Sequence, residues 1–197
     1  GCAMQEPVAM PYPYSAKETL ADASVHALGL VGATAAGTLL IFYVAHTQDS
    51  TQIAATSVYT GLLIFALLAS AAYHMLPWDR WRPIFHRIDH AAIYLKIAGT
   101  YTPLVVLIGS AFAYGVLAVI WTVAVLGAVA KLSFWATDSR GSLPLYLVLG
   151  WASVLLIWPM WQTLPGAAVA LIAAGGLLYA VGTVFYAMKA LRFQNAI

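Results

Sequence analysis

The stretch SAAYHMLPWDRWRPIFHRIDHAAIYLKIAGTYTP, residues 70–103, decides how the fold of this chain is interpreted. An apolar segment ends in Ser70 and His74, a basic turn follows, and a second apolar segment opens with Asp89 and His90. We therefore expect a hydroxyl, a carboxylate and imidazole rings at neighbouring helix ends. Most of the remaining sequence is predicted to be the scaffold around them.

The composition is that of an integral membrane protein. Of the 197 residues, 62% are hydrophobic and only 8% are charged, which is too much apolar surface for one soluble core of this size. We expect membrane lipids as partners. Nucleic acid binding is not indicated, because the few basic residues sit beside hydrophobic segments. The single cysteine, Cys2, has no intrachain disulfide partner.

Six hydrophobic segments are long enough to cross a bilayer, whose core of about 30 Å requires roughly 20 helical residues. The sequence therefore predicts an all-α polytopic bundle with transmembrane helices over about 20–45, 52–76, 88–108, 112–132, 143–164 and 166–190. Residues 1–16 are predicted to be an N-terminal tail, and residues 17–197 the transmembrane domain. Apart from Lys96, the Lys and Arg residues lie before the first span, in or beside alternate connections, and around the end of the sixth. This pattern predicts cytoplasmic termini.

The candidate residues at the centre of the quoted stretch have two interpretations each. Ser70 and His74 share one helix face, where a neutral imidazole can bind zinc and a serine can orient it. The alternative is a histidine that only reaches the membrane interface. Asp89, expected at the start of the third span, is either an N-terminal helix carboxylate or a general base beside a metal-bound water. His86 and His90 are expected to be interfacial.

Polar residues also occur within the spans. Glu18, Asp22 and His26 recur every four residues at the start of the first span, and His26 is deep enough to face the bundle interior. Structural hydrogen bonding and catalysis both remain open for it. Lys96 lies well inside the third span, with Asp89 or a carboxylate of the first span as its possible partner, or with its ammonium extended toward the interface.

Three motifs in this region form the pattern of a known family. They are Ser70-x-x-Tyr73-His74, Asp89-His90-x-x-Ile93-Tyr94, and the run Ile97-Ala98-Gly99-Thr100-Tyr101-Thr102-Pro103. Together they resemble the hemolysin III family, within the progestin and adipoQ receptor superfamily of membrane proteins. Further agreement from Tyr14 onward, including Gly150-Trp151 and Gly175-Gly176, extends the resemblance over nearly the whole chain.

The resemblance implies a seven-helix bundle in a bacterial plasma membrane, with a zinc ion near the cytoplasmic side. It makes His74 a zinc ligand and places Ser70 and Asp89 beside the metal and its water. The family's seventh helix carries a His-x-x-x-His pair with the remaining ligands, and this chain stops at Ile197 before any such helix. Since one histidine cannot hold a catalytic zinc ion, we expect a further span in a longer protein; the alternative is that this version lacks a complete metal site.

These features support three functional hypotheses. In the first, the protein hydrolyses a lipid amide or ester in membrane lipid homeostasis, as in ceramidase-type amidases: zinc supplies hydroxide, Asp89 handles the proton and Ser70 positions the water. In the second, the same residues serve a non-enzymatic sensor or receptor of membrane state. The third, a pore-forming cytolysin, rests on the family's historical name. Few charges lie inside the spans, and they indicate no conducting path.

Overall fold

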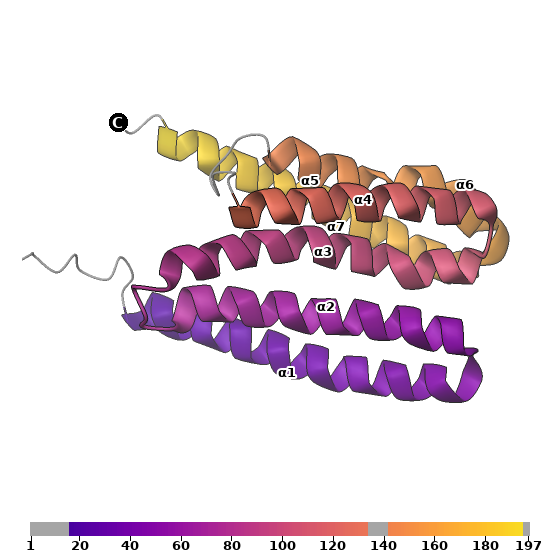
Figure 1. The fold of residues 1–197 in the computed structure, drawn as a ribbon, viewed down its shortest axis with the longest axis horizontal. Helices are drawn as coiled ribbons and strands as arrows, with labels where there is room; N and C mark the ends of the chain where they lie inside the picture. The colour runs from indigo at the N-terminus through magenta and orange to yellow at the C-terminus, as the bar shows by residue number, and fades with distance from the viewer. Residues whose placement is uncertain (1–15, 134–141, 195–197) are drawn as a thin grey trace, which may run out of the picture.

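The computed structural model describes residues 16–133 and 142–194, and these residues form α-helices without any strand (Figure 1). The helices are α1 (Ala16–Thr47), α2 (Ser50–Met75), α3 (Arg82–Ile108), α4 (Ala111–Ser133), α5 (Ser142–Trp151), α6 (Ser153–Thr163) and α7 (Gly166–Gln194). Five helical stretches in the described part are long and apolar enough to cross a membrane, and α7 adds the apolar stretch Gly166–Leu178. The predicted all-α membrane bundle is confirmed.

The connections alternate between two ends of the bundle. The start of α1 and the turn from α2 to α3 lie at one end, on the left of Figure 1, and the turns from α1 to α2 and from α3 to α4 lie at the other. Lys17, Arg80 and Lys131 therefore belong to one end. The charge rule predicts that this end faces the cytoplasm.

Helix α3 is the centre of the arrangement. It packs against α2, α4, α5 and α6, whereas α1 packs against α2 alone among the described helices. The buried face of α3 repeats at spacings of three and four residues, as expected for a helix stripe facing a core. It consists of Ala91, Tyr94, Ala98, Tyr101, Val105 and Ile108. Small residues of α4 let the two helices approach, because a Cβ at Gly127 would lie 2.9 Å from the Tyr94 ring.

The third span begins earlier than the hydrophobicity alone predicted. Helix α3 starts at Arg82, with Pro83 in its first turn, a position that suits proline because no intrahelical N–H bond is lost there. Asp89 consequently lies two turns inside the helix. Its interpretation as an N-terminal helix carboxylate is wrong, and its charge needs another explanation.

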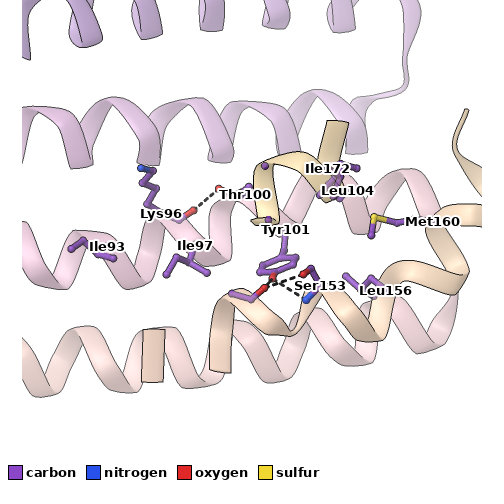
Figure 2. A pocket seen from close by; sticks show the side chains of 13 residues that line it. Ile93, Lys96, Ile97, Thr100, Tyr101, Leu104, Ser153, Leu156, Met160 and Ile172 are labelled. Carbon is purple, nitrogen blue, oxygen red and sulfur yellow. Dashed lines mark hydrogen bonds between the residues drawn. The ribbon is translucent and has the colours of Figure 1, made fainter. Parts of the chain in front are cut away.

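The fifth predicted span is interrupted where α5 passes into α6 at Ala152. The Tyr101 hydroxyl from α3 accepts a hydrogen bond from the Ser153 N–H at 3.0 Å and lies 2.9 and 2.8 Å from the carbonyl oxygens of Leu149 and Gly150 (Figure 2). Backbone groups inside a membrane must be satisfied by protein. At this break the Tyr101 hydroxyl accepts from one backbone N–H and has two carbonyl oxygens within reach of its single hydrogen, and the Gly150 carbonyl also accepts from the Ser153 hydroxyl at 3.0 Å.

Candidate functional site

Four polar side chains from three helices gather at the end of the bundle where α2 passes into α3. We call them the polar cluster: His26 on α1, Ser70 and His74 on α2, and Asp89 on α3. All four are partly buried. The shared helix face predicted for Ser70 and His74 is confirmed, because both side chains meet His26.

His26 is held by hydrogen bonds at both ring nitrogens. Its Nδ1 lies 2.8 Å from the Asp22 carbonyl oxygen one turn earlier, and since a carbonyl only accepts, Nδ1 carries the hydrogen. In a neutral ring Nε2 is then an acceptor. It lies 3.1 Å from the Ser70 Oγ, so the serine hydroxyl donates to His26 across the α1–α2 interface. The prediction that His26 faces the bundle interior is thereby confirmed, and its partners there are Ser70 and His74.

His74 and Asp89 complete the cluster. The ring of His74 lies 5.5 Å from that of His26, centroid to centroid, at an angle of 40°. The Asp89 carboxylate interacts electrostatically with His74, then with His86 and His26. A carboxylate two turns inside α3 is therefore within electrostatic range of imidazole rings from three helices. A potential proton acceptor and the Ser70 hydroxyl thus belong to the same end of the bundle.

A second layer of rings supports the cluster from the side of α3. Tyr73 stacks on His86 with centroids 4.5 Å apart and an interplanar angle of 9°, and also meets His74 edge-on at 4.8 Å. His86 in turn contacts His90 at 4.4 Å. His86 and His90, which the sequence predicted to be interfacial, thus belong to a row of rings that packs beside the polar cluster. Helix spacing alone did not reveal that Tyr73 belongs to this row.

Two arginines secure the helix ends around the cluster. Arg82 donates to the Leu76 carbonyl at 3.3 Å, and it pairs with Asp79 at 3.3 Å. Arg87 donates to the Lys131 carbonyl at 2.9 Å and joins the start of α3 to the end of α4. These contacts fix the turn that positions Asp89 against α2.

Two other candidate residues fall outside the cluster. Lys96 is exposed on α3, and among the described side chains its ammonium has no hydrogen-bond or ion-pair partner. Neither Asp89 nor Asp22 meets it. The side chain of Glu18 lies outside the described residues.

The cluster does not by itself fit a catalytic zinc ion. Such an ion takes three protein ligands and keeps one open position. Among the side chains described in residues 16–133 and 142–194, which leave out that of Glu18, no three His, Cys, Asp or Glu are placed to hold one metal ion. All five histidines of the sequence lie within these ranges. Zinc binding by His74 therefore stays a prediction.

Comparison with known proteins agrees with this combination of polytopic helices and a Ser-x-x-x-His helix end. Residues 14–195 match the family described as "Haemolysin-III related". The chain belongs to this family. It is 33% identical to Hemolysin-3 of Bacillus cereus over 182 residues, 92% of this chain and 83% of that protein. It is also 33% identical to the Hemolysin-3 homolog of Bacillus subtilis over 187 residues, 93% and 87% of the two chains. No solved structure matches it.

Proposed function

We propose that this haemolysin-III-related membrane protein hydrolyses an amide or ester of a membrane lipid at the polar cluster. The observation that carries the proposal is the meeting of His26, Ser70, His74 and Asp89 from three helices at one end of the bundle. That end lies at the level of lipid head groups if the helices span the bilayer. The bond to be broken in such lipids lies close to the same level.

The chemistry rests on two groups of this chain. In this proposal Asp89 accepts a proton from a water molecule as a general base. The water oxygen adds to the lipid carbonyl, the C–N or C–O bond breaks, and the proton passes to the leaving nitrogen or oxygen. Ser70 positions the water, and the hydrogen bond to His26 fixes the direction of the serine hydroxyl.

Zinc at this site is a separate, finer proposal. It follows from the family resemblance, with His74 as one ligand, and it requires ligands beyond the side chains described above. Its test is metal analysis of the purified protein, including any further span of the full-length protein, beside the His74→Ala variant. Bound zinc that is lost in His74→Ala supports the assignment. Equal zinc in both proteins removes it.

The test of hydrolysis is turnover of defined lipid amides and esters by protein in lipid nanodiscs. We expect product with the unaltered protein and a strong loss of it in Ser70→Ala. Ser57→Ala is the matched control, because Ser57 is an exposed serine of the same helix whose hydroxyl donates to the Ile53 carbonyl at 2.7 Å. Equal turnover in Ser70→Ala and the unaltered protein would overturn the assignment of this site.

A second candidate function is a sensor of membrane state. It is favoured by the position of α1, which packs on α2 alone among the described helices and is tied to it by the His26–Ser70 hydrogen bond. An occupant of the cluster that displaces this bond would loosen α1 from the bundle. Lipid binding without product in the turnover assay would favour the sensor over the enzyme.

A further inference from the structure

The fifth hydrophobic span is interrupted where α5 passes into α6, and the Tyr101 hydroxyl of α3 is inserted at that point (Figure 2). In a continuous α-helix the Ser153 N–H would donate to the Leu149 carbonyl four residues earlier. Instead it donates to the Tyr101 hydroxyl at 3.0 Å, and that hydroxyl lies 2.9 Å from the Leu149 carbonyl oxygen. The phenol oxygen thus stands between a donor and an acceptor that an unbroken helix would join directly.

Proline does not account for the interruption. Pro159 lacks the N–H that would otherwise donate to Leu155, so its effect falls inside α6. Pro144 lies in the first turn of α5, where proline costs no helix bond. An inserted side chain is among the few other causes of a sharp bend in a helix, and Tyr101 supplies one. Gly150 adds to the effect, because glycine is a poor helix former.

The Tyr101 hydroxyl has one hydrogen and two carbonyl oxygens within reach, those of Leu149 at 2.9 Å and Gly150 at 2.8 Å. Donation to Leu149 keeps the hydroxyl between the two turns, and the Gly150 carbonyl then accepts from the Ser153 hydroxyl at 3.0 Å. Donation to Gly150 leaves the Leu149 carbonyl for the Ser153 N–H. Both arrangements give these backbone groups a partner, as a membrane interior requires.

The two halves of the span are held to α3 in different ways. On α5, the Tyr146 hydroxyl donates to the His90 carbonyl at 3.3 Å, and its ring lies 4.6 Å from that of Tyr94. On α6, Leu156 and Met160 are buried in the core that α3 shares. Apolar contacts of this kind are not directional, whereas a hydrogen bond is. We therefore expect α6 to be the half that moves.

The direction of α6 also sets the width of a cavity of about 420 Å³ beside the interruption (Figure 2). Lys96 and Ile97 of α3 line one side of this cavity, and Leu156 and Met160 of α6 line another. A rotation of α6 about Ala152 carries its two lining side chains with it. The interruption therefore controls the shape of the protein interior as well as that of one span.

We propose that Tyr101 is a reversible wedge in the fifth span. With its hydroxyl between Ser153 and Leu149 the span is bent; when its hydrogen passes to Gly150, the helix bond closes and α6 rotates toward the axis of α5. A change of about 20°, the size of a sharp kink, moves the far end of α6 by about 5 Å, because its 11 residues extend roughly 16 Å. The wedge is independent of hydrolysis, since none of these residues belongs to the polar cluster.

The test is a pulsed electron-spin measurement of distances between nitroxide labels on the protein in nanodiscs. Cys2→Ser removes the single native cysteine. Labels at Thr51→Cys and Gln162→Cys, both exposed, report the far end of α6 against α2. Labels at Thr51→Cys and Val148→Cys report α5 in the same way. The variants measured with each pair are Tyr101→Phe, Tyr101→Phe with Ser153→Pro, and Tyr114→Phe as the control.

We expect Tyr101→Phe to shift the distance from residue 51 to residue 162 by about 5 Å and to leave the distance from 51 to 148 unchanged. Adding Ser153→Pro should restore the first distance, because proline has no N–H for the Leu149 carbonyl and its ring clashes with that carbonyl. Tyr114→Phe removes a hydroxyl from an exposed ring of α4, so it should change neither distance.

An unchanged distance from 51 to 162 in Tyr101→Phe would overturn the proposal, and so would a shift that Ser153→Pro does not reverse. Thermal melting shows whether each variant is folded. If Tyr101→Phe is unfolded, Ser153→Pro alone is compared with Ile157→Pro, one turn later in α6. A helix bond that is already open at Ser153 predicts that Ser153→Pro keeps the distance and the melting temperature, while Ile157→Pro lowers the melting temperature. No difference between these two variants would contradict the wedge.

Discussion

Two histidines on the same helix show how differently the ends of α1 are used. His26 and His46 each place Nδ1 on the carbonyl four residues earlier, at 2.8 and 2.7 Å. The other nitrogen of His26 reaches Ser70 on α2, whereas the ring of His46 is exposed and lies 4.4 Å from Phe42 on its own helix. An identical local bond is therefore joined by a bond between helices only where the neighbouring helix supplies a polar partner.

The contact between α1 and α2 also differs along the two helices. Near His26 the two helices are joined by a hydrogen bond, while farther along they meet through close packing of Gly37 against Thr60. The Thr60 hydroxyl is buried there and has no hydrogen-bond partner within the described part of the chain. One end is thus built for polar chemistry and the other for steric fit.

The largest expected effect is on lipid hydrolysis, and it distinguishes Asp89 at one end of the bundle from Asp49 at the other. Asp89→Asn removes the proposed base and should lower lipid hydrolysis by about 10²–10⁴-fold. Asp49→Asn should leave it unchanged, because Asp49 caps α2 by accepting from the Gln52 N–H at 2.9 Å and asparagine caps equally well. Initial rates of product release in nanodiscs provide the measurement. A similar loss in both variants would show that the ends are not functionally distinct.

A smaller effect is expected from disturbing the packed part of the interface. A Cβ on Gly37 would overlap the Thr60 methyl group, so Gly37→Leu should destabilise the protein by about 1–3 kcal/mol, the usual cost of overpacking. Gly32→Leu is the control on the same helix, since nothing lies within 4 Å of its Cβ position. Denaturation in mixed micelles compares the two. Equal stability would contradict close packing at this point.

The smallest effect concerns the histidines themselves. His26→Ala removes the link to Ser70 and should cost about 0.6 kcal/mol, and at most about 1.7, as for other hydrogen bonds between membrane helices. His46→Ala should change stability by less than about 0.5 kcal/mol, as for an exposed residue. The same micelle titration measures both. A greater loss in His46→Ala would reverse the comparison between the ends.

Several features of the site were accessible from residue spacing. The four-residue interval between Ser70 and His74 placed both on one face, and the depth of His26 predicted that it faces the bundle interior. The direct bond from Ser70 to His26 was not predictable, because it depends on the rotation of α1 against α2. For Asp89, hydrophobicity located the apolar span but not the first turn of the helix, which Arg82 and Pro83 form in the preceding polar segment.

The cavity beside Lys96 could not be predicted from the sequence, because it also depends on contacts between distant parts of the chain. The lysine and the glycines of α7 were visible as unusual residues, and the continuous apolar run through Trp151 predicted one unbroken helix. The break at Ala152 depends on the Tyr101 hydroxyl, which comes from a helix about 50 residues earlier in the chain and satisfies the backbone there. The sequence around Ala152 does not indicate that Tyr101 will contact it.

The sequence by itself determined the class of the protein and the approximate bounds of its apolar helices, and it supplied the candidate residues for chemistry. Hydrophobic length and helical periodicity are local properties, so the linear order of residues suffices for them. Tertiary structure alone decided that His26 joins Ser70 while His46 packs on Phe42 of its own helix, and that Lys96 borders a cavity. These outcomes depend on how helices rotate and pack against one another, and that is set by contacts between residues far apart in the chain.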